Sequence, residues 1–295
     1  MSPTPLERLA LYFGTVRTRQ GILARAALGV PGAGDLALAG ELATALSAEL
    51  RPDGTVGGGA LPTIWRAHEL LDLGRDRSDP AVAAIVAWLL DSQGRPGAYG
   101  EGCDKARHAQ GVCIHWVRGF FSPAPAEIRV APITLPNGKA FRTEPAARFA
   151  ISCLGLRAAI RAGLGDHPGP RQHLDSLHHL ATQWTSWSGF FAPDTIVAGL
   201  HALALGGPDR SAGVGPVVEL VAAHQGPDGL WPNADLFATL DALHATGHRR
   251  ARAAVRRALP ALAERQRADG SFGATAQQER ALIALRAFLW GHGTA

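Results

Sequence analysis

The chain has 295 residues, of which 46% are hydrophobic, and its formal net charge is +4 at pH 7. This composition favours a folded helical protein, and the lack of an uninterrupted apolar run of about 20 residues argues against a membrane span. Basic residues gather only at 249–257, which we interpret as a solvated helix face, so nucleic acid is not an expected partner. Three cysteines, an odd number, are unlike a secreted disulfide framework and favour the reducing cytoplasm.

Helical patterns and turns alternate in chain order. The pattern predicts inner helices at 61–73, 193–205, 234–245 and 275–290, and outer helices at 79–90, 171–183, 214–224 and 249–266. Asp79-Pro80 is a start signal, because it joins a capping residue to a proline at the first helical position. Each period of the chain therefore consists of one helix, a glycine turn and a second helix.

A turn sequence recurs about every 42 residues. Clear copies begin at Gln93, Gln225 and Gln266, each with a glycine four residues on and an aromatic residue six residues on, and weaker copies lie at the same register. The six turns are near 50–56, 93–99, 134–140, 183–190, 225–231 and 266–272. We predict that the glutamine ties two helices together, that the glycine takes left-handed backbone and that the aromatic ring packs between repeats.

One period, near 120–141, departs from this pattern. Four prolines lie between Phe120 and Phe141, so the helix expected there must be shortened or replaced. A short strand at 127–133 and a turn at Pro136-Asn137-Gly138 are predicted instead. Such a segment either shapes a site or a contact in a homo-oligomer, or it is a tolerated surface insertion.

The repeated turn, clearest as Gln-x-x-Asp-Gly-x-Trp at 225–231, and the helices that follow at 194–203 and 235–243 resemble the terpenoid cyclase and protein prenyltransferase superfamily, including its squalene–hopene cyclase-like repeats. The resemblance runs from about Leu36 to the C terminus. It implies an all-α fold with residues 1–295 forming one (α/α)6 toroid domain, in which outer helices surround inner ones. The inner helices of this superfamily enclose a cavity that typically receives an isoprenoid chain, an apolar small-molecule substrate.

Several motifs of that superfamily are missing. The chain has neither the Asp-x-Asp-Asp run of class II cyclases nor the Asp-Asp-x-x-Asp run of class I synthases. The zinc set of protein prenyltransferases, an Asp and a Cys two residues apart with a distant His, is not reproduced at Asp104 or at any cysteine. The resemblance therefore says more about fold than about reaction.

Polar and aromatic residues recur on one stripe of the inner helices, which we align on Leu203, Leu243 and Leu285. This register makes His201 equivalent to Asp241. Since polar residues on an apolar inner helix should face the cavity, we expect the following to line it: Trp65, His68, Asp72, His108, His115, Trp116, Asp194, His201, Phe237, Asp241 and Arg280.

Acid–base chemistry is the first use we predict for this set. A carboxyl group in an apolar pocket has a raised pKa and can protonate an alkene or epoxide, a role that we assign to Asp241. His201 or His115 would then act as the base. Aromatic faces stabilise cations, so the predicted wall of a substrate site comprises Trp65, His68, Trp116, Asp194, Phe237 and Arg280. The predicted function is that of a terpene cyclase-like enzyme that cyclises or isomerises an isoprenoid or another apolar substrate.

Two alternatives stay open. Cys103, His108 and Cys113 concentrate thiolate and imidazole, which suit zinc as a cofactor, although their spacing matches no regular zinc pattern. Buried cysteines acting as small hydrophobic residues explain the same pattern. A non-catalytic lipid-binding or scaffold protein is the other alternative, because a cavity can bind an apolar ligand without converting it.

Overall fold

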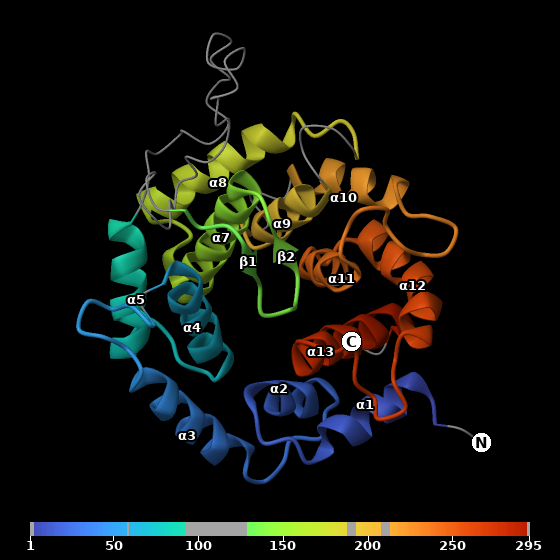
Figure 1. Cartoon of the computed structure of the whole chain (residues 1–295), viewed down its shortest axis with the longest axis horizontal. Coiled ribbons are helices and arrows are strands. Elements are labelled where there is room, and N and C mark those ends of the chain that lie inside the picture. The colour runs from blue at the N-terminus through green and yellow to red at the C-terminus, as the bar shows by residue number, and fades with distance from the viewer. Residues whose placement is uncertain (1–2, 58, 93–128, 188–192, 208–212, 294–295) are drawn as a thin grey trace.

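The computed structural model describes residues 3–57, 59–92, 129–187, 193–207 and 213–293, and nearly all of its regular structure is helical (Figure 1). After α7 the chain continues into one π-helical turn, η1 (Ile160–Leu164). The helices are α1 (Pro5–Gly14), α2 (Arg19–Ala27), α3 (Asp35–Ser47), α4 (Ala60–Asp72), α5 (Pro80–Asp91), α7 (Glu144–Ala159), α8 (Pro168–Ala181), α9 (Pro193–Ala204), α10 (Val214–Ala223), α11 (Leu236–Ala245), α12 (Arg249–Glu264) and α13 (Gln277–His292). The prediction of an all-α protein is confirmed.

Among the described helices, α2, α4, α7, α9, α11 and α13 contact one another in that order, and α13 returns to α2 (Figure 1). The other helices lie outside them, for example α3 against α4, α8 against α9 and α12 against both α11 and α13. Every predicted inner helix is found in the inner set, and every predicted outer helix is found outside it. The two kinds of helix therefore alternate along the described parts of the chain.

Capping residues set where several helices begin. Asp79 accepts a hydrogen bond from the backbone N–H of Ala81 at 2.9 Å, and Pro80 is the first residue of α5, as predicted. Asp235 caps α11 in the same way, through the backbone N–H of Ala238 at 2.9 Å. These side chains satisfy N–H groups that have no partner inside a helix.

The turn at 225–231 has the structure that its sequence predicts, whereas the predicted turn at 93–99 lies outside the described residues. The Gln225 side-chain amide donates to the carbonyls of Gly229 at 2.8 Å and Ala254 at 2.9 Å, which joins the end of α10 to α12. Gly229 has a φ of 79°, and a Cβ there would lie 2.4 Å from a backbone oxygen of α12. The Trp231 ring is buried, and its Nε1 donates to the carbonyl of Val221 at 2.9 Å.

The last turn connects the two ends of the chain. The Gln266 side chain donates to the carbonyl of Pro5 at 3.0 Å and accepts from Arg8 Nε at 2.8 Å, so α12 is bonded to α1. Phe272, the aromatic residue of this turn, is fully buried. The repeat motif therefore ties the C-terminal helices to the N-terminal ones.

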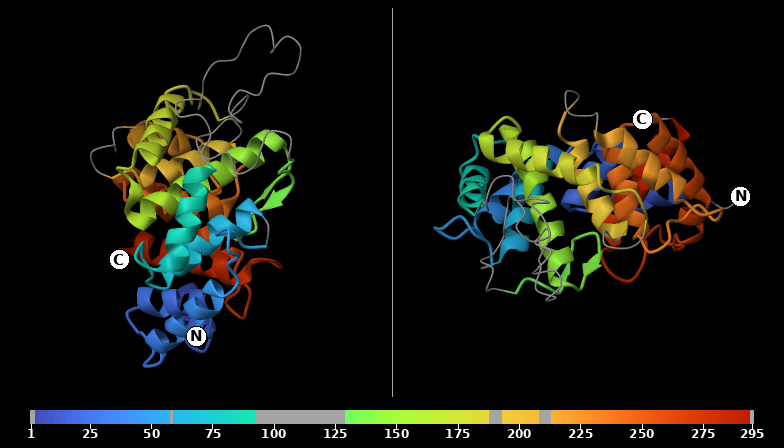
Figure 2. Two further views of the ribbon diagram at one scale, coloured as in Figure 1. Left: turned by 90° about the vertical axis from the view of Figure 1, so that its left-hand side faces the viewer. Right: turned by 90° about the horizontal axis from the view of Figure 1, so that it is seen from above.

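The described part of the Pro-rich segment, from residue 129 on, forms a hairpin at one face of the ring, on the side toward the viewer in Figure 1 and also visible in Figure 2. Its strands β1 (Ile133–Thr134) and β2 (Ala140–Phe141) are antiparallel, and Gly138, with a φ of 84°, donates to the carbonyl of Leu135 at 2.8 Å. The turn is as predicted.

The strand predicted at 127–133 is wrong in its bounds. Within the described residues it begins only at Ile133. The backbone N–H groups of Val130 and Ala131 donate to the Glu144 carboxylate at 2.9 Å and 2.7 Å, so they are not available to a β-ladder. Pro132 has no N–H to contribute.

Replacing Gln225 by alanine should lower the free energy of unfolding by about 1–3 kcal/mol, because it removes both hydrogen bonds to buried or partly buried carbonyls. Urea unfolding followed by far-UV circular dichroism measures the change. Gln172→Ala on the exposed side of α8 is the control and should have little effect. Equal stability of the two variants would contradict the tie between α10 and α12.

His173 in α8 should make folding sensitive to acid. Burial lowers its pKa from 6.5 to about 3, so the unfolded chain takes up a proton before the folded one does. The stability that the neutral side chain provides is complete above its unfolded pKa and is lost as the pH falls toward 3, by about 2 kcal/mol near pH 5. His173→Leu should flatten the loss of unfolding free energy between about pH 7 and about pH 5, whereas His179→Leu at an exposed position should not.

Candidate active site

A cavity of about 220 Å³ lies at the centre of the inner helices and beneath the hairpin turn. It is lined by residues from every inner helix, from η1, from the hairpin turn and from the residue after α9: Arg19, Trp65, His68, Asp72, Leu135, Pro136, Asn137, Leu154, Arg157, Arg161, His201, Leu205, Asp241, His244, Ala245, Glu279 and Arg286. A smaller hollow of about 40 Å³ adjoins it, and both spaces are lined by Leu135, Asn137, Leu154, Arg157, His201 and Asp241.

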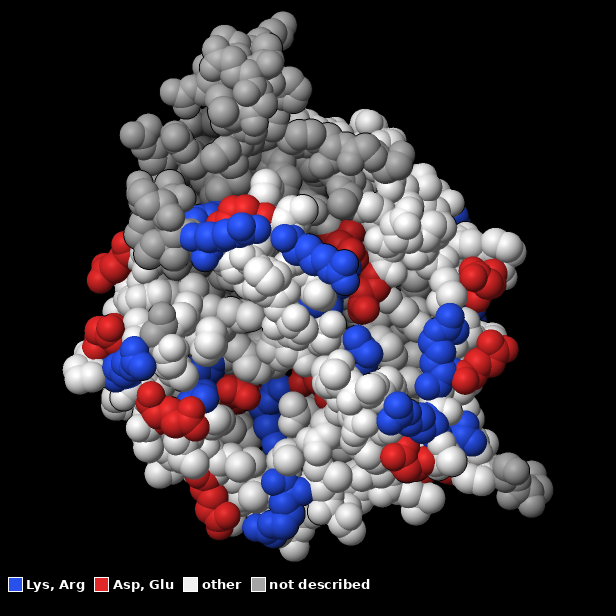
Figure 3. Space-filling model, viewed as in Figure 1, with Lys and Arg blue, Asp and Glu red and all other residues white. Residues whose placement is uncertain are grey.

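The described lining is more polar than the resemblance implied. Seven of the seventeen lining residues are charged and three are histidines. Figure 3 shows acidic and basic side chains beside one another around the hollow of this face. The expectation of an apolar cavity is therefore wrong for the described residues. Charged groups in such a place must be paired or bind a ligand, because they have lost hydration.

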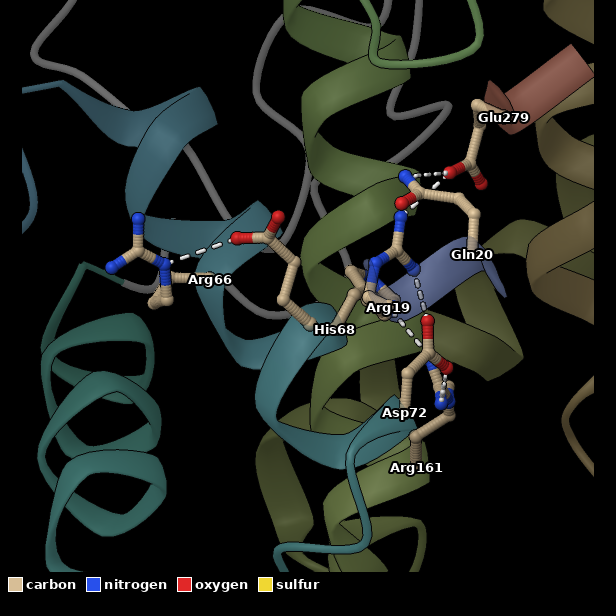
Figure 4. Close-up of polar contacts among 8 residues, drawn as sticks. Arg19, Gln20, Arg66, His68, Asp72, Arg161 and Glu279 are labelled. Atoms are coloured by element: carbon tan, nitrogen blue, oxygen red, sulfur yellow. Dashed lines mark hydrogen bonds and ion pairs between the residues drawn. The ribbon is translucent and has the colours of Figure 1, made fainter. Parts of the chain in front are cut away.

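Arg19 and Arg161 hold one end of the cavity together (Figure 4). Both form ion pairs with Asp72, and the Arg161 Nη2–Asp72 Oδ1 distance is 2.6 Å. Arg19 also contacts Glu279 Oε2 at 2.6 Å, and its guanidinium lies 5.1 Å from the centre of the Trp65 ring. Trp65 thus lines the cavity as predicted, with a cation of the protein already on one face.

His68 is a fixed part of this arrangement (Figure 4). Its Nε2 lies 3.1 Å from the carbonyl oxygen of Leu154, and its Nδ1 lies 2.9 Å from Arg161 Nη1. A carbonyl only accepts and a guanidinium only donates, so Nε2 carries the hydrogen and Nδ1 accepts. Burial, with Arg157 and Arg161 nearby, puts the pKa of His68 well below 6.5. His68 therefore stays neutral and positions Arg161.

His201 and Asp241 meet at the other end of the cavity. The sequence register predicts that these residues are equivalent, and the structure brings His201 Nδ1 to 3.6 Å from Asp241 Oδ2, from the neighbouring helices α9 and α11. Burial and the nearby Arg157 lower the pKa of His201 to about 3, so its ring is neutral near pH 7. Both side chains line the cavity and the smaller hollow.

The pKa of Asp241 moves in the direction opposite to the predicted one. Burial raises the pKa of this carboxyl, but His201 and the guanidinium groups of Arg157 and Arg286 lower it by more. The apolar surroundings on which the prediction depended are absent here, because arginines surround the carboxylate. Asp241 is thus ionised at neutral pH.

Two of the predicted substrate-binding residues, Asp194 and Arg280, hold the hairpin, and Phe237 packs against Arg280. Asp194, at the start of α9, pairs with Lys139 of the hairpin and accepts from the backbone N–H of Asp235 at 3.0 Å. Arg280 donates from Nε to the carbonyl of Asn137 at 2.9 Å and lies over the Phe237 ring at 5.1 Å. Asp194 reaches the smaller hollow, whereas Phe237 and Arg280 are not among the residues that line either space.

The other predicted site residues, His115, Trp116, Cys103, His108 and Cys113, lie outside the described residues. Within the described ranges, no group of three or more His, Cys, Asp or Glu side chains is arranged to hold a metal ion. In the same ranges, no helix has the length and apolar character that a membrane crossing needs.

Sequence reasoning missed five charged residues of the cavity. They are Arg19, Arg157, Arg161, Glu279 and Arg286. Arg157 and Arg161 could have been found from the sequence. They are four residues apart, and thus on one face of a helix, in the mostly apolar segment 151–164. Arg19 carried no such signal, because the helix that contains it was not assigned.

Comparison with known proteins indicates the fold. No protein-family model matches the sequence, and no curated protein matches it significantly. Among solved structures, the apo form of type II terpene cyclase MstE from Scytonema is 20% identical, with a TM-score of 0.52 over 90% of this chain and 72% of that chain. A variant of MstE in complex with geranylgeranyl dihydroxybenzoate, its substrate, is 17% identical, with a TM-score of 0.56 over 98% of this chain and 88% of that chain.

A crystal structure of a protein from Actinoplanes is similar in the same way. It is 16% identical to this chain, and the two superpose with a TM-score of 0.57 over 92% of this chain and 88% of that chain. At these identities the likeness concerns the fold, which is terpene cyclase-like. It supports the fold that the sequence resemblance implied and does not bear on the squalene–hopene cyclase-like repeat turns.

Arg280→Met should loosen the hairpin without unfolding the ring, because it keeps the aliphatic stem and removes the bond to the Asn137 carbonyl. We expect the backbone amides of Leu135 and Gly138, which close the hairpin turn, to exchange with deuterium about tenfold faster. Amides of α5 should exchange at the wild-type rate, and so should the hairpin in Arg249→Met, a change at an exposed position. Unchanged hairpin exchange in Arg280→Met would contradict this role.

Proposed function

We propose that the ring of helices is an (α/α)6 toroid and that the protein is a terpene cyclase-like enzyme that cyclises or isomerises an isoprenoid in the central cavity. The observation that carries the proposal is the meeting of His201 and Asp241, 3.6 Å apart, inside the cavity of a terpene cyclase-like fold. The two residues come from neighbouring inner helices, so the pair is held by packed secondary structure.

The charges of the pair favour removal of a proton as its role. In the proposed step a carbocation loses a proton from the carbon next to its charge, the C–H electrons become a double bond, and the neutral ring of His201 takes the proton. Asp241 stabilises the imidazolium that results. A carbocation is a very strong acid, so a histidine with a pKa of about 3 is a sufficient base.

Asp241 as the proton donor needs a further condition. Its carboxyl is ionised because His201, Arg157 and Arg286 lower its pKa. A ligand that fills the cavity increases the burial of this carboxyl, which raises its pKa against the effect of those three groups. In the proposed enzyme the donor form of Asp241 is therefore favoured when a ligand is bound.

The size of the cavity limits the ligand. At about 220 Å³ it is smaller than the pockets of roughly 300–1,000 Å³ that usually hold drug-sized ligands. Leu135, Pro136 and Asn137 of the hairpin turn form part of its wall. A short isoprenoid fits the proposal directly, and a longer chain requires the hairpin to move.

A non-catalytic lipid-binding protein is the second candidate. The observation that favours it is the pairing of the cavity carboxylates Asp72 and Glu279 with arginines, which suits holding a ligand better than protonating one. Turnover separates the two candidates. The zinc-dependent alternative depends on Cys103, His108 and Cys113, and zinc that is present in the purified protein and lost in Cys113→Ala would favour it.

The test is to incubate the full chain with farnesol and geranylgeraniol and to look for cyclised or isomerised products by gas chromatography and mass spectrometry. His201→Phe and Asp241→Asn should each lower the rate by about a hundredfold or more, because the proton transfer is lost. Circular dichroism checks that both variants fold. Asp175→Asn, at an exposed position of α8, should keep the wild-type rate. Full activity of Asp241→Asn would overturn its role, and binding without any product would favour the carrier.

A further inference from the structure

Two leucines lie where the cavity and the smaller hollow meet, since each of them lines both spaces. Leu154 belongs to α7, where it is buried and its carbonyl accepts from His68 at 3.1 Å. Leu135 belongs to the hairpin and is half-buried. One side of the boundary between the two spaces is therefore an inner helix, and the other side is the hairpin.

The hairpin fixes the position of Leu135. The N–H of this residue donates to the Lys139 carbonyl at 2.8 Å, and its own carbonyl accepts from the N–H of Gly138 at 2.8 Å. Two residues further on, the Asn137 carbonyl accepts from Arg280 of α13 at 2.9 Å. Because the backbone is held on both sides of the turn, the Leu135 side chain is a fixed part of the wall.

Beyond this boundary the smaller hollow offers apolar surface. Part of its wall consists of the Phe141 ring and of Ala198 and Ala238, two small side chains that are half-buried on α9 and α11. The charged groups Lys139 and Asp194 of the same wall are paired with each other. A hydrocarbon chain that entered the hollow would remove the apolar surface from water, which favours binding.

His201 and Asp241 lie at the same boundary, because both of them also line both spaces. A chain that extends from the cavity into the hollow thus passes the pair. The length of chain that fits beyond the pair depends on the opening that the Leu135 side chain leaves.

We propose that Leu135 sets the length of the isoprenoid that the protein accepts, by limiting how far the apolar end of the ligand extends into the smaller hollow. The inference rests on the proposed function and adds the residue that determines chain length. With Leu135 in place, the space suits the shorter chain of farnesol better than the longer chain of geranylgeraniol. Without this side chain the two spaces merge, and the longer chain gains apolar contacts.

The experiment is isothermal titration of the full chain with farnesol and with geranylgeraniol. Wild-type protein should bind farnesol more tightly. Leu135→Ala should change the ratio of the two affinities by about tenfold in favour of geranylgeraniol, a usual effect of small changes in the size of an apolar pocket. Ala238→Leu, which fills the hollow, should change the ratio by about threefold or more in the opposite direction.

Leu205→Ala is the matched control. It makes the same change at a residue that lines the cavity but not the smaller hollow. This variant should change the affinities for the two alcohols alike and leave their ratio at the wild-type value. A change of ratio as large as that in Leu135→Ala would contradict the special position of Leu135.

The double variant Leu135→Ala/Ala238→Leu separates a refilled hollow from a loosened hairpin. Refilling the hollow should return the ratio of affinities to within about threefold of the wild-type value, because the two changes act on one space. A ratio that stays as in Leu135→Ala would assign the effect to loosening of the hairpin and overturn the proposal. Ala238→Leu leaves the hairpin residues unchanged, so it tests the proposal by itself if Leu135→Ala fails to fold.

The outcomes separate this inference from the function on which it rests. If both alcohols bind and neither single variant changes their ratio, the role of Leu135 is overturned and isoprenoid binding stands. Wild-type protein that binds geranylgeraniol more tightly than farnesol would also overturn it, because the hollow would then be open to the longer chain. Failure of both alcohols to bind would overturn the proposed function, and this inference with it.

Discussion

Each inner helix needs a neighbour on both sides, and this requirement is met only because α13 packs against α2. With that contact, the helices between them have no open edge, and apolar residues such as Leu200, Leu240 and Leu285 become fully buried. The Gln266 turn adds hydrogen bonds between the two ends of the chain, to Pro5 and Arg8. Burial of apolar surface is the main source of stability, so the closure supports every other element.

The contact between α13 and α2, which closes the series of inner helices, also gathers their polar residues at the centre. There the cost of removing charge from water is high, and the ion pairs of Asp72 with Arg19 and Arg161 offset it at one end. At the other end the positive neighbours outnumber the carboxylate of Asp241. This imbalance sets the protonation states of His201 and Asp241, and with them the chemistry that the cavity favours.

The hairpin at 133–141 connects this centre to the surface. It is held by Asp194 through Lys139 and by Arg280 through the Asn137 carbonyl, and Glu144 holds the chain just before it through the backbone N–H groups of Val130 and Ala131. Its turn residues form part of the cavity wall. Prolines that exclude a helix from this part of the chain thereby provide a compact cover over the cavity, and the ligand that the cavity admits depends on it.

The sequence by itself determined the order of the described inner and outer helices, the structure of the turns at 225–231 and 266–272, and the equivalent positions of His201 and Asp241 on their helices. These follow from local rules, since helical spacing, capping and glycine turns depend on residues close together in the chain. The sequence did not determine the pKa of Asp241, the contribution of Arg19, Arg157 and Arg286, or the use of Arg280 to hold the hairpin. Only the tertiary structure decided these features, because electrostatic interactions add over all nearby charges, and those charges come from helices far apart in the chain.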